Sequence, residues 1–339
     1  MSSVWDELDR YLDSPSSITT PSEQKGSITA KASFDAKSDV QAVRKAIEGI
    51  GTTEGTLIDI LTQRSNAQRQ QISKAYQEAT GRSLVADLKG DLSGSFENLL
   101  VGLVMPPAVY DAKEIIRAIK GAGTTDSTLI EIFASRNNQQ IRQLSDAYES
   151  ETKRKLLDDL KQEVSGDYGK CLLILAEGKR DETTNVDDAK AKADAKALYE
   201  AGEKKWGTDE SKFIEILCRR SIPQLRKTLV EYKSVSGKTL QQSIEGEMSG
   251  SLEDLLVAVV KCVKNVPAYF AERLYKSMKG AGTDEDTLTR IMVCRSEIDM
   301  LEIRTEFKKL YGTSLHSFIQ SDVSGDYGTG LQKICAGDD

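Results

Sequence analysis

Apolar residues recur along this chain at spacings of three and four, the pattern of helices that bury one face. Near the start, Val40, Val43 and Ile47 form such a face. Capping residues and helix breakers divide residues 34–105 into five predicted helices, the last of them stopped by Pro106-Pro107. The scheme begins again near residues 108, 190 and 265. No stretch alternates with period two long enough to predict a sheet, so we expect an all-α protein.

The junction between the first and second predicted helices has the same form in all four units. The loops read Gly49-Ile50-Gly51-Thr52, Gly121-Ala122-Gly123-Thr124, Lys205-Trp206-Gly207-Thr208 and Gly280-Ala281-Gly282-Thr283. Counted from each threonine, an acidic residue stands at +39, as Asp91, Glu163, Glu247 and Asp322. Arginine stands at +12 and glycine at +42 in each copy. This self-similarity predicts four small helical domains of about 70 residues, and Thr283 is predicted to cap the helix that follows it.

The repeats predict a division of the chain into an N-terminal tail and four repeats. The tail covers 1–33, and the repeats cover 34–105, 106–177, 190–262 and 265–337. The polar connector between the second and third repeats is longer than the others. A connector of that length would let the four repeats pair rather than stack in a line.

The tail carries two patterns. Val4, Leu8 and Tyr11 form an apolar stripe on a short predicted helix that also contains Trp5. Such a stripe needs a groove, either on the protein's own core or on a partner. Residues 14–28 are rich in Ser, Thr and Pro and are predicted to be a flexible linker.

Composition and charge narrow the classes of function. The formal net charge of −7 argues against a general attraction of the protein alone to nucleic acid or to an anionic membrane. No run approaches about 18 apolar residues, so no transmembrane helix is predicted. Five cysteines without a Cys-x-x-Cys pair are expected to be reduced, mostly buried thiols of a cytoplasmic protein. A single histidine, His316, and the absence of a P-loop give no basis for an enzyme.

The loops have the chemistry of a calcium site. Each offers backbone carbonyls and one distant carboxylate, and Ca²⁺ prefers about six to eight such hard oxygens. Three carbonyls and a bidentate carboxylate supply about five, so water or an outside oxygen such as a lipid phosphate must complete the shell. Calcium and acidic lipid should therefore strengthen each other's binding. A Gly-x-Gly-Thr sequence is also a plain turn between helices, and the fourfold recurrence of the acidic partner favours the metal.

Charge and one aromatic residue point to a membrane. Four Ca²⁺ ions would change the net charge from −7 to about +1, which would favour anionic lipid. Trp206 stands in the third loop, where the other loops have Ile50, Ala122 and Ala281. It could insert at a lipid interface, where tryptophan is favoured, or pack on its own repeat.

With these loops the chain resembles the annexins, from about Phe34 to Asp339. Three further motifs carry the resemblance: Ser65-Asn66-Ala67-Gln68-Arg69-Gln70, Arg295-Ser296-Glu297-Ile298-Asp299 and Ser324-Gly325-Asp326-Tyr327. The chain is similar to vertebrate-type annexins, with the subfamily left open. The resemblance implies a curved all-α disc of four five-helix annexin repeats, with calcium-binding loops on the convex face. It also implies calcium-dependent binding to acidic phospholipids by a cytoplasmic protein that calcium recruits to membranes, as a scaffold or linker in membrane organisation, trafficking or exocytosis.

The resemblance also implies a ligand set, carried over position by position. Carbonyls would come from Ile47, Gly49 and Gly51, from Ile119, Gly121 and Gly123, from Gly202, Lys205 and Gly207, and from Met278, Gly280 and Gly282. The matching carboxylates would be Asp91, Glu163, Glu247 and Asp322. Weaker sites would lie at Thr208 with Glu210 and at Thr283 with Glu285. Thr53 and Thr125 depart from the family pattern, which puts the weaker sites of repeats 1 and 2 in doubt.

Two alternatives to membrane binding stay open. The tail is similar to that of an annexin that binds an EF-hand protein, here through residues 3–12, so the chain could be a partner-binding scaffold; Glu7 stands where that annexin has an apolar residue. The other alternative is a calcium-permeable channel, through charged residues at positions that line a polar channel in annexins. These are Asp111, Glu114, Glu131, Arg136, Arg290 and Arg295. We expect them instead to form an ion-pair network that sets the packing of the repeats.

Overall fold

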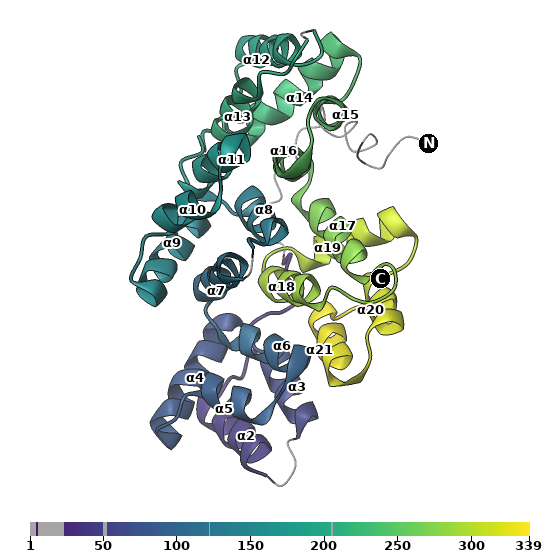
Figure 1. The fold of residues 1–339 in the computed structure, drawn as a ribbon. Helices are drawn as coiled ribbons and strands as arrows, with labels where there is room; N and C mark the ends of the chain where they lie inside the picture. The colour runs from purple at the N-terminus through teal and green to yellow at the C-terminus, as the bar shows by residue number, and fades with distance from the viewer. Residues whose placement is uncertain (1–4, 6–23, 50–52, 122, 205) are drawn as a thin grey trace. The chain divides into compact units, whose positions relative to one another are not determined.

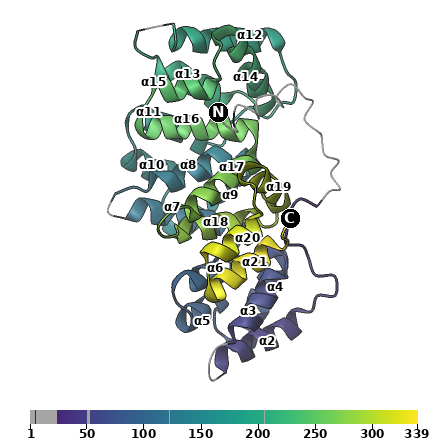
Figure 2. The same cartoon turned by 90° about the vertical axis from the view of Figure 1, so that its right-hand side faces the viewer.

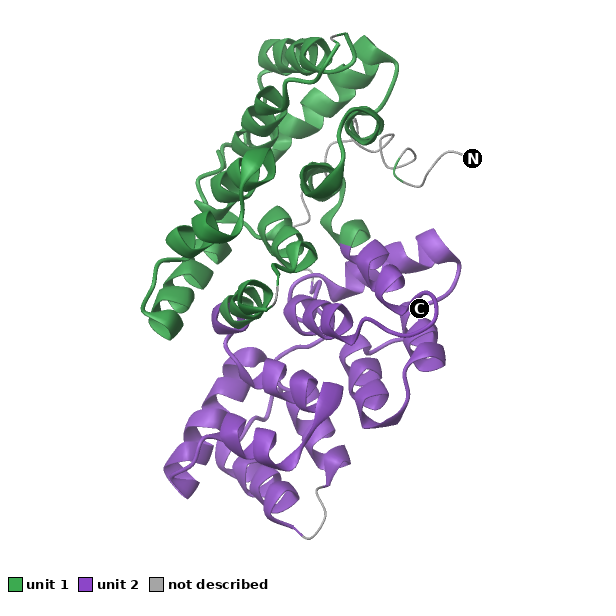
Figure 3. Ribbon diagram, in the orientation of Figure 1, with its two compact units in different colours: residues 1–20, 111–269 green, residues 21–110, 270–339 purple. Residues whose placement is uncertain are grey.

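The computed structural model describes residue 5 and residues 24–49, 53–121, 123–204 and 206–339. Within these ranges the chain forms twenty α-helices and no strand, which confirms the all-α prediction (Figure 1). None of the described helices is long and apolar enough to cross a bilayer. The chain forms two compact units, and their boundaries fall within the helices α7 and α17 (Figure 3).

Unit 2 contains the first and the last repeat of the sequence. The helices of repeat 1 are α2 (Ala36–Glu48), α3 (Glu54–Thr62), α4 (Asn66–Thr80), α5 (Leu84–Asp91) and α6 (Gly94–Val104). Those of repeat 4 are α17 (Val266–Met278), α18 (Glu285–Arg295), α19 (Met300–Tyr311), α20 (Leu315–Asp322) and α21 (Gly325–Cys335). Helix α21 packs against α3 and α6, and α18 packs against α6 (Figures 1 and 2).

Unit 1 contains the two middle repeats. The helices of repeat 2 are α7 (Pro107–Lys120), α8 (Asp126–Ser135), α9 (Asn138–Thr152), α10 (Leu156–Glu163) and α11 (Gly166–Ala176). Those of repeat 3 are α12 (Asp188–Ala201), α13 (Glu210–Arg219), α14 (Ile222–Ser236), α15 (Leu240–Glu247) and α16 (Gly250–Lys264). Helix α16 packs against α8 and α11, and α11 also packs against α13. The repeats therefore pair, as the long connector suggested, and the structure adds the partners: 1 with 4, and 2 with 3.

Local sequence explains where the third helix of each repeat begins and ends. In repeats 1 and 2 it begins at a capping box, formed by Ser65 with Gln68 and by Asn137 with Gln140. In all four repeats it ends at a residue in the left-handed conformation: Gly81, Lys153, Gly237 and Gly312.

The segment before repeat 1 is not a flexible linker where the structure describes it. The amide groups of Ser27 and Ile28 both donate to the carbonyl of Ser296, at 2.8 and 3.0 Å, and the Ile28 side chain is buried. The amide of Leu301 donates to the Lys25 carbonyl at 2.9 Å. Residues 24–28 are thus held on repeat 4, and the linker prediction was wrong for them, because the isoleucine buries apolar surface and the polar residues find backbone partners.

Trp5 is the only described residue among the first 23 residues of the tail. Its side chain is buried in unit 1, with Lys261 Nζ 5.2 Å from the centre of its ring. Lys264 Nζ donates to the Trp5 carbonyl at 3.5 Å. This residue therefore packs on the protein's own helix α16. Val4, Leu8, Tyr11 and the other positions of the predicted stripe lie outside the described residues.

Candidate functional site

Each loop between the first and second helices is closed by a backbone hydrogen bond. In each pair the amide of the later residue donates to the carbonyl of the earlier one. The pairs are Thr53 with Ala46, Thr125 with Ala118, Asp209 with Ala201 and Asp284 with Ser277, at 3.2, 2.9, 2.8 and 2.7 Å. The bond in repeat 3 spans eight residues (209 minus 201), and the other three span seven. The loop that carries Trp206 is therefore one residue longer than the rest.

The acidic residue at +39 returns to the loop in the three repeats whose threonine is described. Thr124 Oγ1 donates to Glu163 Oε2 at 3.2 Å, Thr208 Oγ1 to Glu247 Oε2 at 3.1 Å, and Thr283 Oγ1 to Asp322 Oδ2 at 2.7 Å. In repeat 1, Asp91 ends α5 at the same position, and residues 50–52 lie outside the described residues. The threonine hydroxyl thus holds one carboxylate beside each described loop.

The threonine does not have the role that the sequence predicted for it. The N-cap of the second helix is the next residue, namely Thr53, Thr125, Asp209 or Asp284. The Asp284 carboxylate accepts a hydrogen bond from the Thr287 amide at 3.1 Å. The prediction that Thr283 caps α18 was therefore wrong, because the Asp322 carboxylate binds its hydroxyl instead.

The loop backbone leaves carbonyl oxygens without a donor. The glycine before the threonine has a positive φ, of 95° at Gly123, 86° at Gly207 and 102° at Gly282, which L-residues rarely adopt. Within the described part of the chain, no group donates to the carbonyls of these three glycines or of Gly280. Exposed carbonyls beside one carboxylate form an all-oxygen donor set, which suits Ca²⁺ rather than a soft metal.

The predicted ligands of the four loops are not all described to the same extent. Gly49 and Gly121 are exposed, whereas Gly202 and the Met278 side chain are buried. Gly51 and Lys205 lie outside the described residues. The described residues contain no group of three His, Cys, Asp or Glu side chains placed to share a metal ion. Oxygen ligands beyond the single carboxylate would therefore come from the backbone.

The acidic residues two positions after the threonine differ in what they contact. Ser95 Oγ donates to Glu285 Oε2, and Tyr327 OH donates to the Glu285 carbonyl at 3.2 Å. Ser95 is the second residue of α6 of repeat 1, so this weaker-site residue of repeat 4 joins the two repeats of unit 2. Glu210 begins α13 beside Thr208 and is half-buried.

Unit 1 contains the same inter-repeat contact, which the sequence analysis missed. Ser251 Oγ of repeat 3 donates to Asp126 Oδ2 of repeat 2 at 3.0 Å, and Tyr168 OH donates to Asp126 Oδ1 at 3.0 Å. Burial, and then the Asp126 charge, raise the pKa of Tyr168 well above its usual range, so the phenol stays a donor. The sequence does contain a signal for this contact. The odd-numbered repeats have Ser-Gly-Ser, at 93–95 and 249–251, where the even-numbered repeats have Ser-Gly-Asp-Tyr, at 165–168 and 324–327.

Trp206 does not pack on its own repeat. Its side chain is fully exposed in the loop of repeat 3. Large aromatic side chains bury apolar area wherever the fold offers a place, so an exposed tryptophan is an unusual feature of a soluble surface.

The arginine at +12 makes a bidentate ion pair in three repeats. Its Nε and Nη2 atoms donate to an aspartate on the first helix at 2.8–3.3 Å. The pairs are Arg64 with Asp39, Arg136 with Asp111, and Arg220 with Asp194. In repeat 4 the aspartate is replaced by Phe270, whose ring centre lies 4.5 Å from the Arg295 guanidinium. Arg295 instead pairs with Asp299, at 2.8 and 2.7 Å.

Several of the charged positions that the resemblance assigned to a channel contact a neighbour in the same unit. Asp111 pairs with Arg136, and Glu114 Oε2 pairs with Arg117 at 2.6 Å. Arg290 is buried and donates to Thr287 Oγ1 at 3.4 Å. Together with the Arg295–Asp299 pair, these contacts support the ion-pair network that we expected from the sequence.

Comparison with known proteins gives one consistent result. The family model described as Annexin matches residues 38–103, 110–175, 193–259 and 269–334. The chain is 57% identical to Annexin A3 of Homo sapiens, over 93% of this chain and 98% of the relative. A solved structure named annexin III has a TM-score of 0.91 at 57% identity, covering 93% of this chain and 98% of its own. Calcium-bound annexin (Sm)1 has a TM-score of 0.82 at 33% identity, covering 93% and 94%. The chain therefore belongs to the annexin family.

Proposed function

We propose that this annexin binds Ca²⁺ at its four interhelical loops and, through the bound ions, attaches to membranes that contain acidic phospholipids. The observation that carries the proposal is the threonine–carboxylate bond, which holds a carboxylate beside unbonded loop carbonyls in repeats 2, 3 and 4. A hard-oxygen set with too few protein ligands leaves positions for oxygens of another molecule. Membership of the annexin family, which includes a calcium-bound solved structure, supports the same function.

The proposed protein ligands are the carbonyls and carboxylates already named. They are Ile47, Gly49, Gly51 and Asp91 in repeat 1; Ile119, Gly121, Gly123 and Glu163 in repeat 2; Gly202, Lys205, Gly207 and Glu247 in repeat 3; and Met278, Gly280, Gly282 and Asp322 in repeat 4. We place weaker sites at Thr208 with Glu210 and at Thr283 with Glu285. A bound ion would compete with the threonine hydroxyl for the carboxylate.

Lipid phosphate would complete the calcium shell, so we expect the ion and the acidic lipid to bind cooperatively. Without calcium the whole chain carries a formal charge of −7, which gives it no general attraction to an anionic bilayer. Bound Ca²⁺ would make the surface at the loops attractive to an anionic bilayer. This coupling predicts a protein that is recruited to membranes when calcium rises and released when it falls. The resulting activity would be that of a peripheral scaffold or linker.

Trp206 would contact the membrane. A fully exposed indole in a proposed calcium loop can enter the headgroup region, where tryptophan is favoured. The tail's EF-hand partner is not part of this proposal, because the Trp5 side chain is buried on α16.

The test is vesicle co-sedimentation of a variant that lacks all four carboxylates. The changes are Asp91→Asn, Glu163→Gln, Glu247→Gln and Asp322→Asn. A matched control carries Asp59→Asn, Glu151→Gln, Glu215→Gln and Glu302→Gln, one acid in each repeat, exposed at 59, 151 and 215 and half-buried at 302, with the same change in charge. With phosphatidylserine-containing vesicles, the control should pellet at the calcium concentration that pellets the wild type, and the loop variant should stay in solution. Calcium-dependent pelleting of the loop variant would contradict the proposal.

The membrane role of Trp206 can be measured separately. The chain has two tryptophans, and Trp5→Phe leaves Trp206 as the only fluorophore of that type. Its emission should shift to the blue when Ca²⁺ and acidic vesicles are both present, and with neither alone. Trp206→Ala should weaken vesicle binding by roughly tenfold, since about 1.4 kcal/mol of apolar contact is lost. An emission maximum that stays unchanged on the pelleted protein would place Trp206 away from the bilayer.

A further inference from the structure

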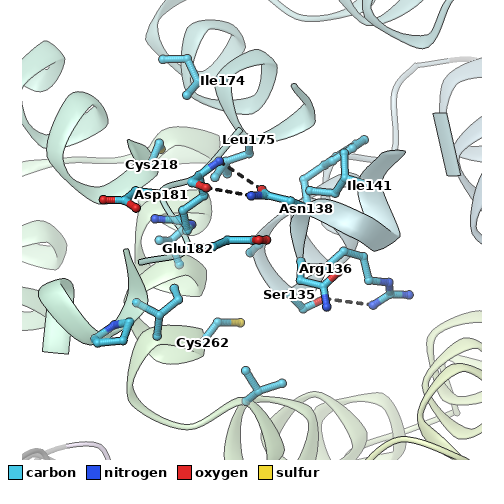
Figure 4. A pocket seen from close by; sticks show the side chains of 18 of the residues that line it. Ser135, Arg136, Asn138, Ile141, Ile174, Leu175, Asp181, Glu182, Cys218 and Cys262 are labelled. Carbon is cyan, nitrogen blue, oxygen red and sulfur yellow. Dashed lines mark hydrogen bonds between the residues drawn. The ribbon is translucent and has the colours of Figure 1, made fainter. Parts of the chain in front are cut away.

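A cavity of about 430 Å³ lies within unit 1, between repeats 2 and 3 (Figure 4). Apolar side chains form much of its wall, among them Phe133, Ile141 and Val259. Cys218 and Cys262 also line it. Figure 4 shows Cys218 close to Asp181, and Cys262 on the opposite side of Glu182. The cavity therefore gives small molecules a route to sulfur atoms that are otherwise buried.

Cys218 lies next to a second thiol. Its Sγ is 3.3 Å from Sγ of Cys171, and the two side chains are 2% and 0% exposed. Cys171 belongs to α11 of repeat 2 and Cys218 to α13 of repeat 3. The pair therefore joins the two repeats, through residues that are 47 positions apart in the sequence. A disulfide has an S–S bond of about 2.05 Å, so the two sulfurs, which are 3.3 Å apart, would have to approach by a little more than about 1 Å.

The surroundings make the two thiols unequal. The hydrogen bond from Cys171, and then the charge of Arg180, lower the pKa of Cys218, while the pKa of Cys171 is raised. Arg180 is held there because its Nη1 donates to the carbonyls of Leu217 and Arg220, at 2.7 and 2.9 Å. Asn138 fixes the backbone of Arg180 through two hydrogen bonds, at 2.7 and 3.1 Å (Figure 4). A thiol beside a fixed cation and open to a cavity has the environment of a reactive cysteine.

We propose that Cys171 and Cys218 form a peroxide-reactive dithiol, which a hydroperoxide converts to a disulfide between repeats 2 and 3. The Cys218 thiolate attacks one oxygen of the hydroperoxide, so that an S–O bond forms as the O–O bond breaks and Cys218 becomes a sulfenic acid. The released hydroxide or alkoxide takes up a proton and leaves as water or an alcohol. The Cys171 sulfur then attacks the sulfenic sulfur, a second water leaves, and the disulfide forms. Two thiols are oxidised and one peroxide is reduced, and a small thiol or dithiol restores the pair.

The disulfide would tie helix α11 to α13. Helix α11 follows the carboxylate of the repeat 2 loop, and α13 begins at the loop of repeat 3. A covalent link that closes a long loop stabilises the folded chain. The inference concerns the stability of unit 1 and holds whether or not the loops bind calcium.

The other cysteines offer internal controls. Burial raises the pKa of Cys335 to about 12, and its thiol donates to the Gly337 carbonyl. Cys262 lines the same cavity as Cys218 and therefore tests whether access alone decides reactivity. Cys294 is half-buried and tests whether exposure decides it.

The experiment is disulfide mapping of the full-length reduced protein after a short exposure to hydrogen peroxide. Remaining thiols are alkylated, and the peptides are analysed without reduction. A Cys171–Cys218 peptide should form, while Cys262, Cys294 and Cys335 are recovered alkylated. We expect loss of the Cys218 thiol to be about tenfold or more faster than loss of the Cys335 thiol. Loss of the Cys171 and Cys218 thiols to peroxide at the same rate as loss of the Cys335 thiol, or a disulfide between other cysteines, would overturn the proposal.

Two variants separate the steps. In Cys171→Ala, Cys218 should stop at the sulfenic acid, which dimedone traps. In Cys218→Ala, Cys171 should stay reduced. Oxidation should raise the thermal midpoint of the wild type and of Cys335→Ala, and a dithiol should reverse the rise; neither Cys171→Ala nor Cys218→Ala should respond. If a variant unfolds, the mapped peptides of the wild type still decide the question.

Discussion

Unit 1 and unit 2 are built on one plan. Each pairs an odd-numbered repeat with an even-numbered one, and in each a serine hydroxyl from the odd repeat binds the carboxylate two positions after the loop threonine of the even repeat. The pairs are Ser251 with Asp126 in unit 1 and Ser95 with Glu285 in unit 2. Neighbours in sequence form unit 1, whereas the two ends of the chain form unit 2. The contact between repeats therefore does not depend on how far apart they are in the chain.

The units differ in how they hold the arginine at +12. Both repeats of unit 1 supply an aspartate from the first helix, Asp111 and Asp194. In unit 2, repeat 1 does the same through Asp39, but repeat 4 has Phe270 at that position and takes its carboxylate from Asp299. A buried guanidinium needs a counter-charge, and the direction from which it comes is free as long as the distance is short. A carboxylate partner for this arginine is therefore present in every repeat, whereas the position in the chain that supplies the carboxylate varies.

The largest effect should come from removing these carboxylates. Asp111→Asn should lower the free energy of unfolding by about 3 kcal/mol, because it leaves Arg136 charged, buried and without its bidentate partner. Asp299→Asn should cost about 2 kcal/mol, because Arg295 keeps its contact with the Phe270 ring. Urea denaturation followed by circular dichroism measures both. The exposed Asp59→Asn is the control and should change the midpoint little; equal losses for Asp111→Asn and Asp59→Asn would refute this account.

Removing the serine contact should change calcium binding in unit 2 but not in unit 1. Ser251→Ala and Ser95→Ala should each lower stability by about 1 kcal/mol, the value of one hydrogen bond. Glu285 is a proposed calcium ligand, so its release by Ser95→Ala should raise calcium affinity at the weaker site of repeat 4, by roughly fivefold. Asp126 is not a proposed ligand, so Ser251→Ala should leave calcium binding unchanged. Calorimetric titration with calcium compares the two; the same response from both variants would count against a calcium role for Glu285.

The smallest expected effect is a dependence on pH that both units share. Tyr148 OH donates to Asp159 at 2.6 Å, and Tyr76 OH donates to Asp87 at 2.6 Å. The pKa of Asp159 is lowered, mainly by its bond to Arg154, and that of Asp87 mainly by its bond to Tyr76. A carboxyl whose pKa is lower in the folded state stabilises the fold above its unfolded pKa of about 3.9, and that stability is lost as pH falls through the folded value.

Asp159→Asn and Asp87→Asn should therefore lower stability near neutral pH, by less than about 1 kcal/mol each. The difference from the wild type should shrink toward zero in acid. Repeats 3 and 4 have Ser243 and Phe318 at the matching positions and serve as the natural comparison. Urea midpoints measured across the acidic range test this, and a difference that persists at the lowest pH would contradict it.

Much of the fold could be predicted from the sequence, because the signals are local. The spacing of apolar residues predicts buried helix faces, such as that of Val40 and Val43, and capping residues and helix breakers predict the helix ends. The 39-residue interval between Thr124 and Glu163 recurs in every repeat, and the structure places the two side chains 3.2 Å apart. A fourfold repeat turns such a weak local signal into a strong one.

Other features could not be read from one sequence. Thr283 is as good an N-cap as Asp284, and only the position of Asp322 decides which residue caps α18. The burial of Ile28 depends on repeat 4, which lies far along the chain. The Ser-Gly-Ser motif marks the serines that serve contacts between repeats, such as Ser95, but the sequence does not show which carboxylate each of them binds.

The sequence by itself determined the helices, the four loops and the acidic partner of each loop, since periodicity, caps and repeat spacing are properties of the chain alone. Only the tertiary structure decided that repeat 1 pairs with repeat 4 and repeat 2 with repeat 3, that Ser251 binds Asp126, and that the Cys171 and Cys218 sulfurs meet. The physical reason is that these contacts join residues far apart in the chain. Their partners are chosen by which apolar helix faces bury each other most completely, and a linear pattern does not record that choice.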